Sequence, residues 1–220
     1  MANVGVFDVL GPIMIGPSSS HTAGAARLGK MASMIVGKEI KEVNFLLHGS
    51  FGQTYKGHGT DRALVAGILK MDADDRKLKD ALELAKKKGI QIRFTPTDLG
   101  QVHPNTVEFL ITDVDGGQWK IQGSSIGGGL VEINLINEYQ VHLTGERPTL
   151  ITSHKDIPGT VAKISEILYE GNMNIATMTL ARSQRGLDAT MTIEVDGDIT
   201  EKIVSQIRRV EGIKRVIVIQ

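Results

Sequence analysis

The sequence predicts an α/β (α+β) protein in which a mixed α/β domain is followed by a ferredoxin-like domain. The chain has 220 residues, which is enough for two modest domains. Glycine-rich loops and most of the histidines precede residue 137, whereas the residues after 148 show clean strand and helix periodicity. We therefore expect domains at residues 1–137 and 148–220, joined by a linker at 138–147.

The second domain is predicted from hydrophobic spacing. Apolar residues recur at helical spacing between Pro158, which suits a first helical turn, and Gly171, which suits a helix stop. Apolar and polar residues alternate strictly along 187–195, which predicts a half-buried strand, and a second amphipathic helix follows over 199–210. The other expected strands span 149–153, 175–181 and 213–219. The resulting order, βαββαβ, is the ferredoxin-like split.

The first domain is predicted to be mixed α/β. Its expected helices span 20–36, 61–71 and 77–88. Its expected strands span 42–48, 91–95, 106–113, 118–123 and 130–136. Asp115, Gly116 and Gly117 together predict a hairpin turn between two of these strands.

Composition excludes several classes of protein. Lys plus Arg equals Asp plus Glu, at 25 each, so a nucleic acid is not expected as the main partner. No apolar run approaches the roughly 20 residues that cross a bilayer, and the N-terminus lacks a basic region and carries Asp8. We therefore expect a cytoplasmic protein. The chain has no cysteine, which excludes disulfides, thiolate catalysis and thiolate ligation of zinc or an iron–sulfur cluster by this chain.

The first candidate site is the run GPSSSHT at residues 16–22, before a helix rich in small residues. A helix N-terminus offers free N–H groups and a partial positive charge, and the hydroxyls of Ser18, Ser19, Ser20 and Thr22 would add donors for a carboxylate or phosphate. The alternative is a simple helix cap, which needs only one serine.

The second candidate site is a predicted loop between His48 and His58. Glycines on both sides of His58 let the backbone approach a ligand, and a histidine there can act as a general base near neutral pH. Thr60 or Asp61 is expected to cap the next helix. The alternative is a surface histidine beside a helix cap.

Two further segments are weaker signals for a site. His103, Pro104 and Asn105 precede a strand, and the glycine-rich run at 123–129 could form a bulge or an anion cradle. That run lacks P-loop spacing, and there is neither an HExxH motif nor a dinucleotide-binding GxGxxG. No metal site is expected in this chain.

A candidate effector site lies in the second domain. A turn at 156–160 begins a helix, where an amino-acid carboxylate could dock on backbone N–H groups, and Asn174 follows the far end of the same helix. The residues assigned to this site are Asp156, Pro158, Gly159, Thr160, Asn174 and Ile175. The alternative is turn chemistry alone, which these residue types also favour.

Taken together, these segments resemble the beta chain of iron–sulfur-dependent L-serine dehydratases. The resemblance rests on Val6, Phe7 and Asp8, the run 11–15, GPSSSHT at 16–22, GHGTD at 57–61, HPN at 103–105 and SIGGG at 125–129. It covers nearly the whole first domain, which in this family is related to the allosteric substrate-binding domain of some phosphoglycerate dehydrogenases. The second domain is similar to an ACT domain, a regulatory module that commonly binds small amino acids between paired copies.

The resemblance implies the conversion of L-serine to pyruvate and ammonia, with a 4Fe–4S cluster held by a cysteine-bearing alpha subunit. It implies His58 as the base, with His21 as the second choice and an alpha-chain residue as the remaining alternative. The substrate-binding or interface residues it implies are Ser18, Ser19, Ser20, Thr22, Ser50, Thr60, Asp61 and Asn105. Serine is the implied effector, self-association through ACT domains is expected, and a monovalent cation is a further possible cofactor. The competing hypothesis is a regulatory subunit that senses amino acids without taking part in catalysis.

Overall fold

A computed structural model describes residues 13–14, 16–182, 184 and 186–219. The chain divides into two compact units, residues 1–137 and 138–220, and each is described by itself. Residues 6–8, 11, 12 and 15, which contribute to the resemblance above, lie outside the described residues.

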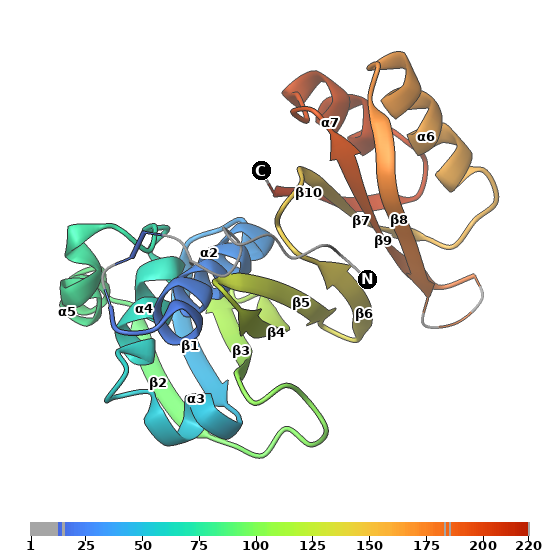
Figure 1. Ribbon diagram of the computed structural model, residues 1–220. Coiled ribbons are helices and arrows are strands. Elements are labelled where there is room, and N and C mark those ends of the chain that lie inside the picture. The colour runs from blue at the N-terminus through green and yellow to red at the C-terminus, as the bar shows by residue number, and fades with distance from the viewer. Residues whose placement is uncertain (1–12, 15, 183, 185, 220) are drawn as a thin grey trace. The chain divides into compact units, whose positions relative to one another are not determined.

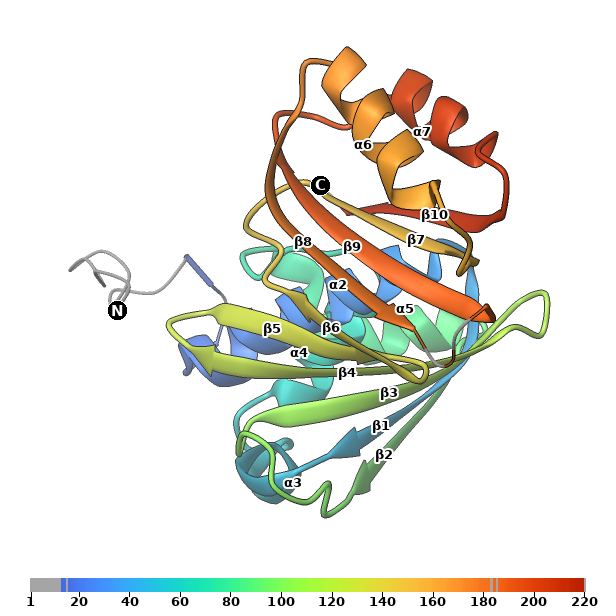
Figure 2. The ribbon, with the colours of Figure 1, turned by 90° about the vertical axis from the view of Figure 1, so that its right-hand side faces the viewer.

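The first unit combines a mixed sheet with helices. Its strands are β1 (Ile40–Leu47), β2 (Gln91–Pro96), β3 (Thr106–Asp113), β4 (Gln118–Gly127) and β5 (Leu130–Ile136). They lie in the order β2-β1-β3-β4-β5, with β1 and β2 parallel and the other neighbours antiparallel. The helical elements are η1 (Ser19–Gly24), α2 (Ala25–Val36), α3 (Gly49–Thr54), α4 (Thr60–Ile68), η2 (Arg76–Asp80) and α5 (Ala81–Lys87). Figures 1 and 2 show α2, α4 and α5 on one face of this sheet.

The contact between α2 and α4 depends on two glycines. A Cβ on Gly67 would lie 2.1 Å from the carbonyl oxygen of Ala26, and one on Gly29 would lie 2.3 Å from that of Leu64. The absence of side chains at these glycines therefore lets the two helix backbones approach closely. On the sheet, Phe45 and Phe109 are fully buried.

The second unit is the predicted ferredoxin-like domain. It contains β6 (Tyr139–Leu143), β7 (Thr149–Lys155), α6 (Thr160–Glu170), β8 (Asn174–Arg182), β9 (Asp188–Asp196), α7 (Glu201–Arg208) and β10 (Ile213–Ile219). The four-stranded sheet has the order β10-β7-β9-β8, which is the βαββαβ topology expected from the sequence. In Figure 2, α6 and α7 lie on one face of this sheet, where Leu150, Ile164 and Ile193 belong to one apolar core.

Several local expectations were wrong. The predicted loop after His48 contains helix α3, and the predicted linker contains strand β6. Strand β9 is buried along both faces: Thr192, on the face opposite the core, is 5% exposed. The alternating pattern assigned the polar residues of β9 to a solvent-exposed face. These residues are covered because β6 packs against β8 and β9.

Two helix starts also differ from the prediction. The residue that precedes α4 is Gly59 in the left-handed conformation, so neither Thr60 nor Asp61 caps this helix. Likewise Gly159, with φ of 92°, precedes α6, and Pro158 lies before the helix rather than in its first turn. In both places glycine adopts a backbone conformation that a side chain would strain, so the chain can turn sharply into the helix.

Candidate functional site

Four segments that are far apart in the sequence meet at one end of the first unit's sheet. The backbone N–H of His48, just after β1, donates to the carbonyl of Thr106 at 3.0 Å, and that of Ser125 donates to Asn105 at 3.0 Å. Helix η1, which begins at Ser19, packs against β4 and α4. The predicted candidate segments at 16–22, 48–61, 103–105 and 123–129 therefore form one region rather than four.

His21 lies at the centre of this region. The side chain of Ser18 accepts from the backbone N–H of His21 at 3.3 Å, so Ser18 does cap the helix, as the simpler interpretation required. Ser18 Oγ also lies 3.4 Å from His21 Nδ1, and Ser50 Oγ lies 3.1 Å from His21 Nε2. Both ring nitrogens of His21 thus have a hydroxyl at hydrogen-bonding distance, which fixes the orientation of the ring.

A second histidine contacts the first. The ring of His58 meets that of His21 edge to face, with ring centroids 4.9 Å apart. The ring of Phe51 also contacts that of His21, with ring centroids 5.2 Å apart. Burial lowers the pKa of His21, and the neighbouring His58 lowers it further, against a smaller opposing effect of Ser50. His21 is therefore held in the neutral form at neutral pH, while His58 is exposed at the surface.

Several buried polar atoms around this pair have no hydrogen-bond partner among the described residues. They are the hydroxyl oxygens of Thr22, Thr60 and Ser125 and the side-chain oxygen of Asn105. A Cβ on Gly24 would lie 2.1 Å from Ser125 Oγ, so the glycine is what makes room for this hydroxyl. Buried polar groups are nearly always paired in folded proteins, so this set is suited to a polar ligand or a partner chain.

A small cavity of about 260 Å³ opens beside His58. Thr22 and the backbone of Gly57 and Gly59 line it together with three cationic side chains. These are Lys56, Arg62 and Lys79, none of which was predicted to be a site residue. Lys56 and Arg62 directly flank GHGTD in the sequence, which was the available signal, whereas Lys79 comes from η2 and had none. Three cationic side chains together suit a site for an anionic group.

The remaining predicted residues of this site have more modest settings. Ser19 and Ser20 open the π-helical turn η1 and are half-buried. Asp61 accepts from the backbone N–H of Arg62 at 2.8 Å, and burial raises the pKa of its carboxyl group. The chain has no cysteine, and within the described part no group of three or more His, Cys, Asp or Glu could hold a metal ion.

The predicted effector residues of the second unit fall into two separate groups. Asp156, Pro158, Gly159 and Thr160 precede or begin α6, whereas Asn174 lies beyond its other end. The 11 residues of α6 place these groups about 16 Å apart along the helix axis. One copy of the unit therefore does not bring all of the predicted effector residues together.

The side chains in these two groups are already engaged within the chain. Asp156 accepts from the backbone N–H of Gly186 and from Arg182, both at 3.0 Å, and these contacts lower the pKa of its carboxyl group. Thr160 donates to the carbonyl of Ile157 at 3.2 Å, and Asn174 donates to Asp196 at 3.0 Å. Backbone groups near Gly159 are thus better placed for a ligand than the Asp156 carboxylate.

Comparison with known proteins identifies both units. Residues 5–89 match the family model "Serine dehydratase beta chain", and residues 149–212 match the ACT domain model. The chain is 43% identical to the "Probable L-serine dehydratase, beta chain" of Bacillus subtilis and 41% identical to the "L-serine dehydratase, beta chain" of Peptoniphilus asaccharolyticus. Each alignment covers 96% of this chain and 96% of the relative.

A more distant relative shares both units. The chain is 25% identical to a D-3-phosphoglycerate dehydrogenase of Synechocystis, over 86% of this chain and 34% of that protein. No helix in the described ranges has the length and apolar character needed to span a membrane. The full-length similarity is decisive: the chain belongs to the family of L-serine dehydratase beta chains and carries a C-terminal ACT domain.

Proposed function

We propose that this chain is the subunit of an L-serine ammonia-lyase that completes the active site with its histidine loops. A cysteine-bearing alpha subunit, present in the cytoplasm with it, would hold a 4Fe–4S cluster. The two most similar relatives described above are beta chains of L-serine dehydratases, and a beta chain implies a partner subunit. The absence of cysteine from all 220 residues supports placing the cluster in that partner.

The observation that carries the proposal is the convergence of His21 and His58 with buried polar atoms that lack partners. Thr22, Thr60 and Asn105 each offer such an atom, which suits them to the carboxylate or ammonium group of serine. Ser18 and Ser50 lie at hydrogen-bonding distance from the His21 ring, so we assign them to positioning it. Ser19, Ser20 and Asp61 would contact the substrate or the partner subunit.

In this proposal His58 accepts the Cα proton of serine. The hydroxyl group leaves with the electron pair of its C–O bond, and the resulting enamine hydrolyses to pyruvate and ammonia. When bound in the partner, the cluster would act as a Lewis acid toward the departing hydroxyl. His58 suits the role of base because it is exposed beside the cavity, whereas buried, neutral His21 is better suited to hold its neighbour in place.

The test is co-expression with the alpha subunit under anaerobic conditions and an assay of pyruvate formation from serine. His58→Asn should reduce turnover by about 10²- to 10⁴-fold, the usual cost of losing a general base. His142→Asn, a change at an exposed histidine of the second unit, is the matched control. Near-normal turnover of His58→Asn with intact cluster absorbance would contradict the assignment and favour a subunit that only senses amino acids.

A second proposed function is serine sensing by the ACT domain. It is supported by the backbone at Gly159, where the start of α6 offers free N–H groups to a carboxylate. Strand β8 lies at one edge of the four-stranded sheet, and pairing of two copies along it would bring Asn174 of one copy toward a second chain. Calorimetry of the full chain with L-serine tests this: wild type should bind, and Gly159→Val should bind at least tenfold more weakly. Absence of serine binding by wild type would refute the sensing role.

A further inference from the structure

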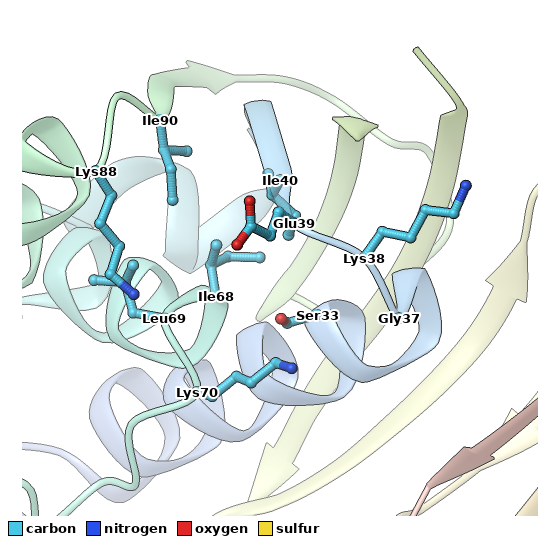
Figure 3. Close-up of a pocket in the computed structure, with 10 residues that line it drawn as sticks. All are labelled: Ser33, Gly37, Lys38, Glu39, Ile40, Ile68, Leu69, Lys70, Lys88 and Ile90. Carbon is cyan, nitrogen blue, oxygen red and sulfur yellow. The ribbon is translucent and has the colours of Figure 1, made fainter. Parts of the chain in front are cut away.

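A second, larger cavity lies in the first unit, far from the histidines. Its volume is about 700 Å³, within the range of small-molecule sites, and its walls include Ile40, Ile68, Leu69 and Ile90. Figure 3 shows it between the end of α2, the end of α4 and the connection from α5 to β2. Ile40 begins β1 and His48 follows its last residue, so the eight residues of β1 separate the two sites by about 26 Å.

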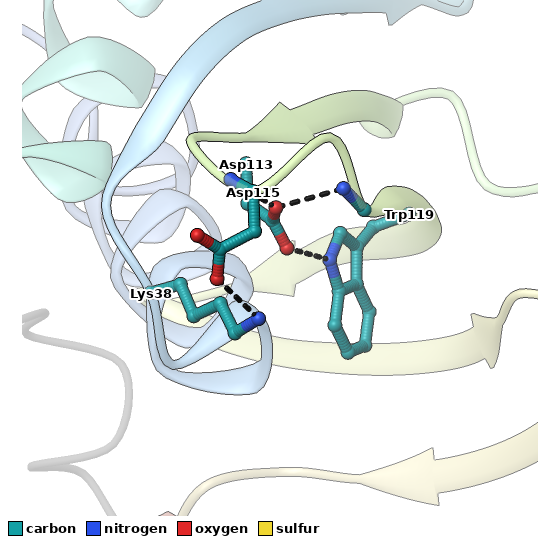
Figure 4. A network of polar contacts seen from close by, with 5 residues as sticks. Lys38, Asp113, Asp115 and Trp119 are labelled. Atoms are coloured by element: carbon teal, nitrogen blue, oxygen red, sulfur yellow. Dashed lines mark hydrogen bonds and ion pairs between the residues drawn. The ribbon is translucent and has the colours of Figure 1, made fainter.

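Three charged side chains from three different connecting segments line this cavity (Figure 3). They are Lys70, Lys88 and Glu39, and none of them forms an ion pair or a side-chain hydrogen bond with a residue that the structure describes. Lys38 also borders the cavity, but its Nζ lies 2.6 Å from Asp115 (Figure 4). The charged groups available to a ligand are therefore two ammonium groups and one carboxylate.

The backbone at Lys70 is an independent sign that this side chain matters. Lys70 has φ of 64°, in the left-handed region where L side chains are strained and glycine is favoured. It follows α4 in a closing turn in which Lys70 N–H donates to Gly67 and Met71 N–H to Ala66. Glycine could form the same turn, so a lysine at this strained position lowers the stability of the fold. A role for the ammonium group of Lys70 would offset this loss of stability.

The charges favour a ligand that carries both signs. The carbonyl ends of α2 and α4 add partial negative charge beside Glu39, which suits an ammonium group. Lys70 and Lys88 suit the carboxylate of a ligand, and the four aliphatic side chains that line the cavity suit an apolar side chain. We propose that this cavity binds an α-amino acid with an aliphatic side chain, at a site separate from both the histidine loops and the ACT domain.

The experiment is calorimetry of the purified full chain with L-leucine as the probe. Two analogues divide the recognition: 4-methylpentanoate lacks the ammonium group and 3-methylbutylamine lacks the carboxylate. Leucine should bind more tightly than either analogue. Lys88→Gln and Lys70→Gly should each weaken leucine binding by about 10- to 150-fold, the range for a lost hydrogen bond to a charged group. Glu39→Gln should weaken leucine but leave 4-methylpentanoate unchanged.

Controls separate this site from the others. Lys86→Gln alters a nearby lysine of α5 that does not line the cavity, and it should leave binding unchanged. Gly159→Val alters the ACT domain and should also leave leucine binding unchanged. The proposal is overturned if leucine does not bind, if only Gly159→Val abolishes binding, or if 4-methylpentanoate binds as tightly as leucine. These results are independent of turnover, so failure of the catalytic proposal would not affect them.

Discussion

The rings of His21 and His58 meet nearly at right angles, with centroids 4.9 Å apart and an interplanar angle of 85°. Burial lowers the pKa of His21, and the adjacent ring of His58 lowers it further. The pair therefore combines a fixed neutral imidazole with an exposed one.

The first prediction concerns stability at low pH. Burial, followed by His58, lowers the pKa of His21 below its ordinary value of 6.5, so the unfolded chain binds a proton before the folded chain does. The free energy of unfolding should thus be highest above pH 6.5 and decrease as the pH falls through 6.5 toward the folded-state pKa. One proton contributes a slope of at most about 1.4 kcal/mol per pH unit.

Urea denaturation at pH 7.5 and pH 5.0 measures this effect. His21→Asn cannot titrate, so the decrease in unfolding free energy between the two pH values should be smaller than in wild type. Burial also lowers the pKa of His154, which is 2% exposed, and His21→Asn combined with His154→Asn should reduce the decrease further. An unchanged decrease in the double variant would show that neither histidine is protected from protonation in the folded chain.

The second prediction concerns the hydroxyl that fixes His21. Ser50→Ala removes the group 3.1 Å from Nε2 and leaves a largely buried ring nitrogen without its partner. The free energy of unfolding should fall by about 1–3 kcal/mol, measured by urea denaturation. Turnover of the reconstituted enzyme should fall, but by less than with His58→Asn, because Ser50→Ala displaces the ring of His21 and leaves the proposed base, His58, in place. Ser165→Ala on α6 is the control, and an equal loss there would remove any special role for Ser50.

The order of elements in the second unit could be predicted because its apolar residues follow strand and helix periods. Helix α3 could not: its sequence, GSFGQT, has two glycines and only Phe51 buried. Strand β9 looked half-buried because Thr190, Thr192 and Glu194 are polar, yet these residues are buried and β6 packs against the strand. Polarity marks the exposed face of a strand only when nothing packs on that face.

The candidate site was predicted as separate segments. GPSSSHT and SIGGG are more than 100 residues apart, and their proximity follows from sheet order, which the sequence does not state. The unpartnered hydroxyl of Ser125 depends on that same proximity, and Lys79 reaches the cavity beside His58 from η2, whereas Lys56 and Arg62 are close to His58 in the sequence itself. Residue types therefore indicated the chemistry, and the strand pairing determined which residues act together.

The third prediction concerns the crossing of α2 and α4. Gly67→Ala places a Cβ within 2.1 Å of the Ala26 carbonyl and 2.6 Å of the Lys30 amide. Alanine is normally the better helix former, yet overpacking here should lower the free energy of unfolding by about 1–3 kcal/mol. Gly57→Ala, where the nearest atom is 3.7 Å away, is the matched control and should change stability little. Equal stability of the two variants would mean that the helices can move apart at no cost.

The fourth prediction links stability and binding at Lys70. Because φ at this position is 64°, Lys70→Gly relieves the left-handed strain, and the free energy of unfolding should rise by about 0.5–1 kcal/mol. Lys86→Gly, in the last turn of α5, should instead lower it by up to about 1 kcal/mol. Thermal and urea denaturation of both variants measure these opposite signs.

The same variant should lose affinity for leucine as it gains stability. If Lys70 served only to end the helix, its replacement by glycine would leave leucine affinity unchanged, whether or not stability rose, since glycine forms the same closing turn. A stabilised Lys70→Gly chain with weakened leucine binding therefore identifies a functional lysine kept at a structural cost. A stabilised chain with unaltered leucine binding would show that the strain serves no ligand, and a destabilised one would show that Lys70 makes contacts that outweigh its backbone strain.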